Sequence, residues 1–368
     1  MVFHVLSIPV HPTRKEITLC AFTQKVYKFC KIMTARGHTV FHYGHPDSKV
    51  NCTQHFNVIS RATYDEVYQQ KSWKEFLPQK VFNKAHEEFN KNAAALIKKN
   101  KQSDEDFVLA FWGFGHAACC NELKDDYIIV EPSIGYNSGF APFKVFETYA
   151  QLHTLHHQIY EKTTGPSFTD HVIRPGFYLE DFEYKENKEN YLLFLGRMVD
   201  VKGIQIAQDL SKASSTPIKF VGPHNLKNKL KKNNPLAEYI PTVSHEERKK
   251  LLSNAKALVM PTLYIEPCGW SMIEAFISGT PVLSTDWGGF SEYNIHGKTG
   301  FRCRSLNEFY HALESINFIK PQFCRKYAEE NFTIELVAAM YETYFEHLIQ
   351  VRKYGLGTVF NKCKFLVK

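Results

Sequence analysis

The feature of this sequence that most constrains its fold is a regular alternation of short apolar runs with longer helical patterns. In the first half of the chain, apolar runs of strand length occupy residues 3–8, 39–43, 107–111, 127–130 and 172–174. The first run is followed by a helical pattern over residues 18–36 and by a turn at Gly37. Because strands that alternate with helices form parallel sheets covered by helices, the pattern predicts an α/β fold.

A second alternation of the same kind fills the other half of the chain. Its strand-length runs occupy residues 191–195, 218–221, 257–260, 281–284 and 300–302. Helical spacing covers residues 202–213, 246–255, 271–277, 306–316, 321–331 and 334–352. Between the two halves, residues 181–190 are dense in charge and lack apolar periodicity, which suits a linker or surface loop.

We therefore predict two doubly wound parallel sheets in two domains. The first domain covers residues 1–178 and the second covers residues 179–333, while residues 334–368 form a terminal helix and a basic tail. The carboxyl ends of parallel strands are where open α/β sheets bind ligands. The loops that follow strands are therefore the first places to look for functional residues.

The composition is that of a folded globular protein. The chain has 368 residues, of which 44% are hydrophobic and 23% are charged. Its longest apolar stretch, residues 107–120, is too short to span a bilayer, and residues 1–12 lack the basic start of a signal sequence. The nine cysteines include no Cys-x-x-Cys pair, which is typical of buried thiols in a reducing compartment. We expect a cytoplasmic protein without a transmembrane helix.

The net charge of +7 favours anionic partners such as phosphates, nucleotides, nucleic acid or an acidic membrane face. The chain lacks the dense basic and aromatic stripe that is typical of nucleic-acid binding, so we do not expect a nucleic-acid partner. Its clustered lysines are typical of solvated helix ends. Peripheral contact with a membrane face stays open.

The loop after residues 191–195 carries two cations at the start of a helix. Gly196 and Arg197 leave the predicted strand, and Lys202 precedes Gly203 at the helix start. Arginine offers a bidentate fork and lysine a point charge, so both side chains beside a helix N-terminus suit a phosphate group. The alternative is a pair of ordinary loop cations.

The loop after residues 257–260 carries two carboxylates eight residues apart, Glu266 and Glu274. Glu266 precedes the predicted helix and Glu274 lies in its first turns, with the amides of residues 269–272 between them. This arrangement suits a ligand with hydroxyls at both ends and a diphosphate in the middle, such as a nucleotide sugar. The alternative for Glu274 is a capping box with Ser271, in which the carboxylate only closes the helix start.

Several motifs then occur in one order along the second half. They are Gly196-Arg197-x4-Lys202-Gly203, Val221-Gly222-Pro223, Glu266-Pro267-x-Gly269-x4-Glu274-Ala275, Gly279-Thr280-Pro281-Val282, Gly288-Gly289-x2-Glu292 and His296-Gly297-Lys298-Thr299-Gly300-Phe301. In this order they resemble the retaining nucleotide-sugar glycosyltransferases of family 4. The resemblance is specific from residue 191 to residue 301, and over the first domain it is mainly architectural.

The resemblance implies a GT-B fold, in which two Rossmann-like domains face a cleft. It assigns the donor nucleotide to the second domain and the acceptor mainly to the first, and it makes the terminal helix cross back toward the first domain. It implies a metal-independent reaction without a cofactor, in which a sugar moves from a nucleotide diphosphate to an acceptor hydroxyl with retention. The usual proposal for such enzymes is a front-face route, and a glycosidase-like pair of carboxylates is the competing mechanism.

The resemblance also implies roles for individual residues. Arg197 and Lys202 would hold the diphosphate and stabilise it as it leaves, Glu266 would contact the donor sugar, and Glu274 would bind the ribose hydroxyls. His116 would lie near the donor sugar and the acceptor, which adds it to Arg197, Lys202 and Glu266 as catalytic candidates. The other donor-binding candidates are Gly196, Cys268, Gly269, Trp270, Ser271 and Met272.

The first domain departs from the family pattern after its first strand. Many family members have a Gly-Gly loop there, whereas this chain has Pro9-Val10-His11-Pro12-Thr13-Arg14-Lys15-Glu16-Ile17-Thr18. We take His11, Arg14 and Thr18 as acceptor-binding candidates; the alternatives are a contact of Arg14 or of the amides near Thr18 with the donor phosphate, and a rigid surface turn. Tyr136 and Asn137 follow a later strand and are further acceptor candidates, with an ordinary turn as the alternative. For His116 the alternative is a buried histidine bonded to the backbone.

The sequence therefore predicts a retaining glycosyltransferase that acts in glycan or glycoconjugate synthesis, with a nucleotide sugar and a hydroxyl-bearing acceptor as partners. Two other functions stay open. One is a sugar-nucleotide epimerase on the same fold, and the other is a catalytically silent protein that binds sugar nucleotides or glycans. The residues identify neither the donor base nor the acceptor, because backbone groups that leave no residue signature read much of a nucleotide base.

Overall fold

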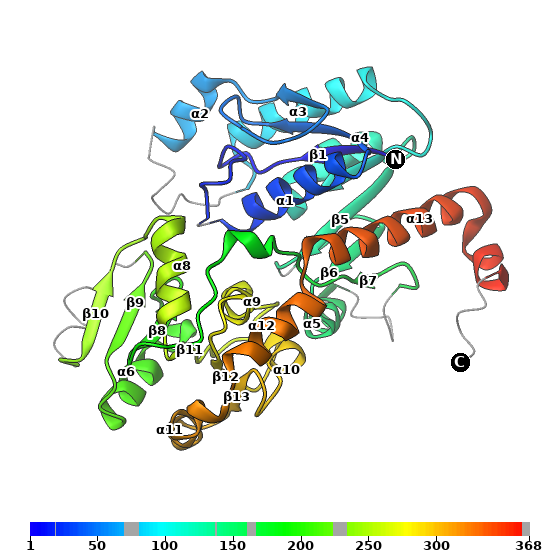
Figure 1. Cartoon of the computed structure of the whole chain (residues 1–368). Coiled ribbons are helices and arrows are strands. Elements are labelled where there is room, and N and C mark those ends of the chain that lie inside the picture. The colour runs from blue at the N-terminus through cyan, green and yellow to red at the C-terminus, as the bar shows by residue number, and fades with distance from the viewer. Residues whose placement is uncertain (19, 70–80, 137, 160–166, 224–233, 363–368) are drawn as a thin grey trace. The chain divides into compact units, whose positions relative to one another are not determined.

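The computed structural model of the chain describes residues 1–18, 20–69, 81–136, 138–159, 167–223 and 234–362. The chain divides into two compact units (Figure 1). Unit 1 consists of Met1–Glu147, Leu152–Arg174 and Ile334–Lys368, and unit 2 consists of Thr148–Gln151 and Pro175–Thr333. The main change of unit thus falls at residues 174 and 175, and a short stretch of four residues, Thr148–Gln151, belongs to unit 2 although its neighbours belong to unit 1.

Unit 1 is built on a parallel sheet that has seven strands among the described residues, in the order β3-β2-β1-β4-β5-β6-β7. The strands are β1 (Val2–Leu6), β2 (Thr39–Gly44), β3 (Gln54–Asn57), β4 (Phe107–Ala110), β5 (Ile128–Ile134), β6 (Phe143–Phe146) and β7 (His171–Val172). Sequence analysis missed β3 and β6. Both have only four residues, and β3 is a half-exposed edge strand, so neither carries a long apolar run.

The helices of unit 1 are α1 (Ala21–Ala35), α2 (Arg61–Tyr68), α3 (Lys84–Lys99), α4 (Ala117–Leu123) and α13 (Ile334–Lys362), while α5 (Tyr149–Ile159) begins in the stretch that belongs to unit 2. Sequence analysis gave bounds for only two of these helices, α1 and α13. Helix α1 starts three residues later than predicted. Helix α13 extends ten residues further than predicted, and Gly355 breaks its helical geometry with φ 71° and ψ 161°.

The terminal helix α13 is part of unit 1 because it packs against α1 and the sheet. Its Phe345 ring lies 4.8 Å from the rings of Phe3 and Phe107, which come from β1 and β4. At the outer edge of α13, Glu342 accepts hydrogen bonds with both carboxylate oxygens from the guanidinium of Arg36, at 2.7 and 2.6 Å. This pairing lowers the pKa of Glu342 to about 2. The end of the chain therefore completes the core that its first residues begin.

Unit 2 is built on a second parallel sheet, with the order β10-β9-β8-β11-β12-β13 among the described residues. Its strands are β8 (Leu192–Leu195), β9 (Ile218–Val221), β10 (Ala237–Ile240), β11 (Ala257–Met260), β12 (Val282–Thr285) and β13 (Gly300–Cys303). Its helices are α6 (Ile204–Ala213), α8 (His245–Asn254), α9 (Trp270–Ile277), α10 (Gly289–Tyr293), α11 (Leu306–Glu314) and α12 (Pro321–Asn331). The edge strand β10 and the short helix α10 were not predicted.

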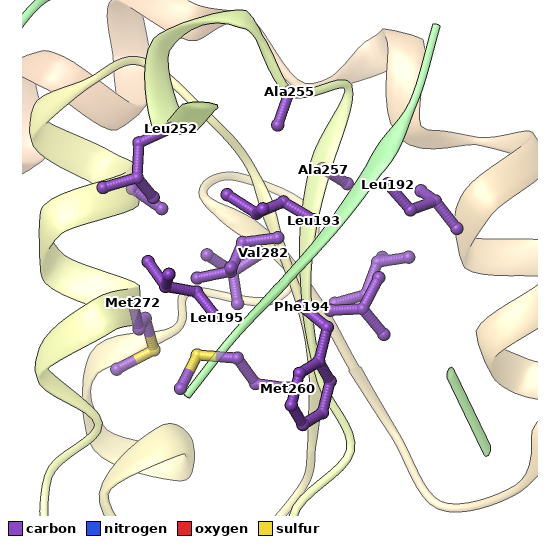
Figure 2. Close-up of a cluster of buried hydrophobic side chains, with 14 of the residues drawn as sticks. Leu192, Leu193, Phe194, Leu195, Leu252, Ala255, Ala257, Met260, Met272 and Val282 are labelled. Atoms are coloured by element: carbon purple, nitrogen blue, oxygen red, sulfur yellow. The ribbon is translucent and has the colours of Figure 1, made fainter. Parts of the chain in front are cut away.

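The core of unit 2 forms on both faces of the central strand β8, because successive side chains of a strand point to opposite faces. Figure 2 shows Leu193 and Leu195 on the side where Leu252 and Met272 lie, with Leu192 on the opposite side. All of these side chains are buried. Helices therefore cover both faces of the sheet, and the predicted fold class of two parallel-sheet α/β domains is confirmed.

The charged segment 181–190 is bonded to unit 2 and is not a free linker. The Nζ of Lys188 donates to the carbonyls of Ser253 and Ser278 at 2.8 and 3.0 Å and to the hydroxyl of Thr280 at 3.0 Å. Burial lowers the pKa of Lys188 to about 8. A charge-rich sequence hides this kind of anchoring, because the composition does not show that one lysine satisfies three buried acceptors.

Among the described residues, no helix combines the length and the hydropathy needed to cross a membrane. The longest apolar stretch, residues 107–120, forms β4, a short 3₁₀ turn at Gly113–His116 and the start of α4.

Buried histidines of unit 1 make its stability sensitive to acid. Burial lowers the pKa values of His11, His45 and His86 to about 4 and that of His116 to about 3. In the unfolded chain these groups titrate near 6.5, so below that pH the unfolded state binds protons that the folded state does not. We predict that the unfolding temperature is constant between about pH 6.5 and pH 8 and falls steadily from pH 6.5 toward pH 4, as measured by circular dichroism.

The control for this prediction replaces one histidine at a time. His86 accepts a hydrogen bond from the indole of Trp112 at 3.2 Å, and glutamine retains an acceptor there. His86→Gln is expected to flatten the acid side of the curve, whereas His311→Gln, at an exposed position, leaves its slope unchanged. Equal slopes for the two variants and the unmodified chain would rule out this origin of the acid sensitivity.

Candidate functional site

The loop after β8 brings Arg197 and Lys202 to the carboxyl edge of the unit 2 sheet. Arg197 is exposed, and Lys202 ends a short 3₁₀ turn, Asp200–Lys202, before α6. The turn ends on Gly203, whose φ of 72° is left-handed and whose α-hydrogen faces the carbonyl oxygen of Pro261. A Cβ at this position would lie 1.9 Å from that oxygen, so only glycine lets the two loops meet.

The loop after β11 places Glu266 directly against Lys202. The Nζ of Lys202 donates to Oε2 of Glu266 at 2.5 Å, and both side chains are less than one-fifth exposed. The hydroxyl of Tyr264 donates to the same oxygen at 2.8 Å, and the ammonium lies 4.8 Å from the Tyr264 ring centre. Burial, and then the neighbouring Glu266 charge, raise the pKa of Tyr264, so its hydroxyl remains a donor at neutral pH.

The two cations of the predicted phosphate site share this neighbourhood. The positive charge of Arg197 opposes the rise in the pKa of Tyr264, which places the guanidinium within electrostatic range of the Lys202, Tyr264 and Glu266 group. The two cations and the carboxylate therefore gather at the carboxyl ends of β8 and β11, two neighbouring strands of the sheet. This is the edge at which open α/β sheets bind ligands.

A glycine pair after β12 holds the Glu266 loop in place. The N–H of Gly289 donates to the carbonyl of Glu266 at 2.8 Å, and the indole N–H of Trp287 donates to the carbonyl of Tyr264 at 3.1 Å. Gly288 has a φ of 61°, and a Cβ there would lie 2.6 Å from the Glu266 carbonyl oxygen. The Gly288-Gly289 motif is thus the support for the Glu266 backbone.

The helix α9 begins two residues earlier than the capping-box alternative requires. Its N-cap is Gly269, in the left-handed conformation, and no side chain caps the helix. Ser271 is therefore the second helical residue and Glu274 the fifth, so neither holds the position of a capping-box partner. The structure excludes the capping box, and it leaves the start of α9 with the partial positive charge of a helix N-terminus.

Glu274 is instead paired with Arg248, which lies on α8. Nε of Arg248 donates to Oε2 of Glu274 at 2.9 Å, and Nη2 donates to the same oxygen. Nη2 also lies 3.4 Å from the Ser271 hydroxyl. The side chain of Glu274 is 12% exposed. The second carboxylate of the Glu-x7-Glu pair is therefore held by a cation of its own.

Glu292, the last residue of the Gly-Gly motif, has a structural partner within unit 2. Its two carboxylate oxygens accept the N–H groups of Tyr149 at 3.0 Å and Ala150 at 2.7 Å, which are the first residues of α5. Next to them, the hydroxyl of Thr148 donates to the carbonyl of Pro267 at 2.6 Å. These bonds join the short Thr148–Gln151 stretch to the Glu266 loop and explain why it belongs to unit 2.

The predicted donor residues all lie in unit 2, but they do not all present side chains. Cys268 and Met272 are buried in the core, and Met272 points toward the β8 side chains in Figure 2. Trp270 packs its ring against Phe177 at 5.1 Å between ring centres. At Cys268 and Met272, and at Gly196 and Gly269, only backbone groups are left for a ligand, whereas the Trp270 side chain is half-buried.

His116 lies in unit 1, and both of its ring nitrogens are bonded to backbone groups. Nε2 donates to the carbonyl of Ser7 at 2.8 Å, while Nδ1 accepts the N–H of Trp112 at 3.3 Å. The side chain is fully buried, and its ring stacks on Phe89. Because burial also keeps this imidazole neutral, His116 has no free nitrogen for a proton transfer. The geometry fits the buried, backbone-bonded alternative and not the catalytic one.

The acceptor candidates also lie in unit 1. His11 is buried, and its Nδ1 has no hydrogen-bond partner among the described residues. Arg14 donates through Nε to the carbonyl of Asp47 at 2.5 Å, and Thr18 is half-buried. Tyr136 donates its hydroxyl to Glu131 at 2.9 Å, and Asn137 lies outside the described residues. Arg14 and Tyr136 thus already form hydrogen bonds that help to hold their own loops in place.

Sequence reasoning missed two side chains of the unit 2 site, Tyr264 and Arg248. Tyr264 stands two residues before Glu266 in the same loop, and its aromatic ring beside a predicted cation was an available signal. Arg248 stands 26 residues before Glu274 in a helix that is otherwise polar, and no spacing rule connects the two. Only the packing of α8 beside α9 reveals that pair.

Comparison with known proteins connects this site to one family. Residues 179–317, which lie within unit 2, match the family model described as glycosyl transferases group 1. A D-rhamnosyltransferase of Pseudomonas aeruginosa, WbpZ, is 32% identical over 117 residues. That match covers 30% of this chain and 31% of the relative, so the chain aligns with only about a third of its curated relative's length.

Solved structures are similar over nearly the whole chain. Sucrose-phosphate synthase from Thermosynechococcus elongatus superimposes with a TM-score of 0.75 at 15% identity, covering 95% of this chain and 99% of that one. Anabaena HepE in complex with UDP-glucose gives a TM-score of 0.68 at 12% identity, covering 95% and 100% of the two chains. The chain thus has the GT-B fold of glycosyltransferases, and its residues 179–317 match the group 1 glycosyl transferases.

Proposed function

We propose that this protein is a retaining glycosyltransferase, which moves a sugar from a nucleotide diphosphate to an acceptor hydroxyl without a metal ion or cofactor. The observation that carries the proposal is the group formed by Lys202, Glu266 and Tyr264 at the carboxyl edge of the unit 2 sheet, with Arg197 in electrostatic range. The match of residues 179–317 to group 1 glycosyl transferases supports it.

Arg197 and Lys202 would bind the diphosphate of the donor. The Lys202 ammonium has three N–H donors and uses one of them on Glu266, which leaves donors for phosphate oxygens. Arg197 adds a planar fork, and the N-terminus of α9 adds a partial positive charge. These groups stabilise negative charge that grows on the leaving phosphate, which is the role that a divalent metal has in other transferases.

Glu266 would bind hydroxyls of the donor sugar. Lys202 and Tyr264 both donate to its Oε2, and no described residue donates to its Oε1. A carboxylate oxygen of this kind accepts hydrogen bonds from sugar hydroxyls. The same geometry ties the sugar-binding carboxylate to the phosphate-binding cation.

For the chemical step we propose a front-face route. The bond between the anomeric carbon and the phosphate oxygen breaks, the acceptor oxygen attacks from the same face, and its proton passes to the departing phosphate. The competing route needs two carboxylates on opposite sides of the bond. Glu266 and Glu274 are each paired with a different cation, Lys202 and Arg248, which supports separate binding roles for them.

The partners in this proposal are a nucleotide sugar and a glycan or other hydroxyl acceptor in the cytoplasm. The solved structure of Anabaena HepE contains UDP-glucose, and that supports a nucleotide sugar here. Contact with an acidic membrane face is the least supported part, and it rests on the net charge of +7. An epimerase or a silent binding protein gains no support from the family match, and donor hydrolysis distinguishes both from a transferase.

The first test is a donor screen. Thermal-shift and saturation-transfer NMR measurements with UDP-, GDP-, ADP- and dTDP-sugars, in buffer without metal, are expected to show one ligand that raises the unfolding temperature. A bound ligand stabilises the folded state by mass action, so the shift grows with its concentration. A folded protein that responds to none of these sugars would contradict the proposal.

Loss of either phosphate-binding cation is expected to slow transfer strongly. We predict that Arg197→Ala and Lys202→Ala each reduce turnover of the identified donor by about 100-fold or more, because each removes a charge from the transition state. Arg304→Ala, at an exposed residue paired with Asp286, is the control and keeps full activity. Near-normal turnover in both site variants would remove the phosphate assignment.

Metal removal is expected to have no effect. Because two cations and a helix N-terminus surround the proposed diphosphate site, we predict equal initial rates with excess chelator and with added magnesium. The measurement follows nucleotide release by coupled assay at saturating donor. A chelator-sensitive rate that magnesium restores would show that the protein cations alone do not neutralise the leaving group.

A further inference from the structure

The hydrogen bonds between Arg248 and Glu274 are asymmetric, and the packing of α8 against α9 does not by itself require this. Nε and Nη2 of Arg248 both donate to Oε2 of Glu274, although a guanidinium facing a carboxylate squarely would give one donor to each oxygen. Among the described residues, none donates to Oε1. The carboxylate is therefore anchored through one oxygen, and its other oxygen is left as an acceptor.

This free acceptor sits in a largely desolvated place. The Glu274 side chain is 12% exposed and that of Arg248 is 20% exposed. Burying a carboxylate this far from water is costly unless a counter-charge and further hydrogen-bond donors compensate for the lost water. Arg248 supplies the counter-charge from α8, and the part of the chain that the structure describes supplies no donor for Oε1.

We infer that Arg248 is a positioning residue for the donor nucleotide: it fixes Glu274 so that Oε1 accepts the vicinal hydroxyls of a ribose. The inference rests on the proposed function and assigns to it a residue outside the matching motifs. Arg248 itself does not touch the ligand. Its contact to the Ser271 hydroxyl, 3.4 Å from Nη2, also ties the carboxylate to the start of α9, where the proposed phosphate contacts lie.

The expected consequence is a preference for ribose over 2′-deoxyribose that depends on Arg248. A hydrogen bond from a hydroxyl to a carboxylate is stronger than one between neutral groups, so removing the 2′-hydroxyl is expected to weaken binding by about tenfold or more. Without Arg248, the Glu274 side chain is free to rotate, and the preference disappears. A residue with only a structural role would change stability without changing this ratio.

The experiment measures dissociation constants by calorimetry for UDP, GDP and ADP and for their 2′-deoxy counterparts. The ratio for the tightest-binding pair is then compared in the unmodified chain, Glu274→Gln, Arg248→Met and Arg248→Lys. We expect the ratio to fall toward one in Glu274→Gln and Arg248→Met. Lysine restores the charge but not the planar fork, so Arg248→Lys is expected to be intermediate and serves if Arg248→Met does not fold.

Arg325→Met is the matched control. Arg325 donates from α12 to the carbonyl of Ile277 at 3.0 Å, at the far end of the same helix α9. This variant also removes an arginine that holds α9, so it is expected to lower the unfolding temperature while the ratio stays unchanged.

The outcomes separate this inference from the proposed function. A ratio kept in Arg248→Met but lost in Glu274→Gln overturns the role of Arg248. Nucleotide binding without any ribose preference in the unmodified chain also overturns the inference, while the nucleotide-binding part of the proposed function stands. If no nucleotide binds, both fail.

Discussion

The site in unit 2 depends on close approach between the backbones of successive loops at one edge of the sheet. Gly203 meets the Pro261 carbonyl where a Cβ would be 1.9 Å away, and Gly288 meets the Glu266 backbone in the same way. These contacts bring the loop after β8 and the loop after β12 each against the loop after β11. The distance between Lys202 and Glu266 follows from this packing. Lys202 and Glu266 therefore form their ion pair because the backbones of these loops can approach each other closely.

The charges themselves are arranged as separate pairs. Lys202 holds Glu266 through one oxygen, and Arg248 holds Glu274 through one oxygen, so each carboxylate keeps an acceptor and a neighbouring cation. A half-buried carboxylate without a partner would be costly, and a fully satisfied one would have nothing to offer a ligand. Each carboxylate here has one oxygen bound to a cation and one oxygen left as an acceptor. This makes the two ends of the Glu-x7-Glu segment suitable for polar hydroxyl groups.

Much of this was predictable from the sequence, for reasons that differ by feature. The sheets follow from apolar alternation, which missed β3, β6 and β10; of these, β3 and β10 are partly exposed edge strands without a continuous apolar run. Arg197, Lys202 and Glu266 stand in loops that follow strands, and Glu274 stands in the next helix, all within recognisable motifs. The capping box failed because helix α9 begins at Trp270, and a shift of one or two residues at a helix start is beyond sequence patterns. Arg248 and the bonding of His116 depend on tertiary contacts between distant segments, for which spacing carries no signal.

The placement of α13 has a consequence for how the protein forms during synthesis. Unit 1 is discontinuous, and its core includes Phe345 from a helix near the end of the chain, whereas the main part of unit 2 is the continuous stretch 175–333. Domains generally fold as units as the ribosome releases them. The residues around Phe3 and Phe107 are therefore synthesised before α13, and their apolar surface stays exposed until α13 packs on it. The amino-terminal half of this chain is thus the part with the longest exposure to chaperones.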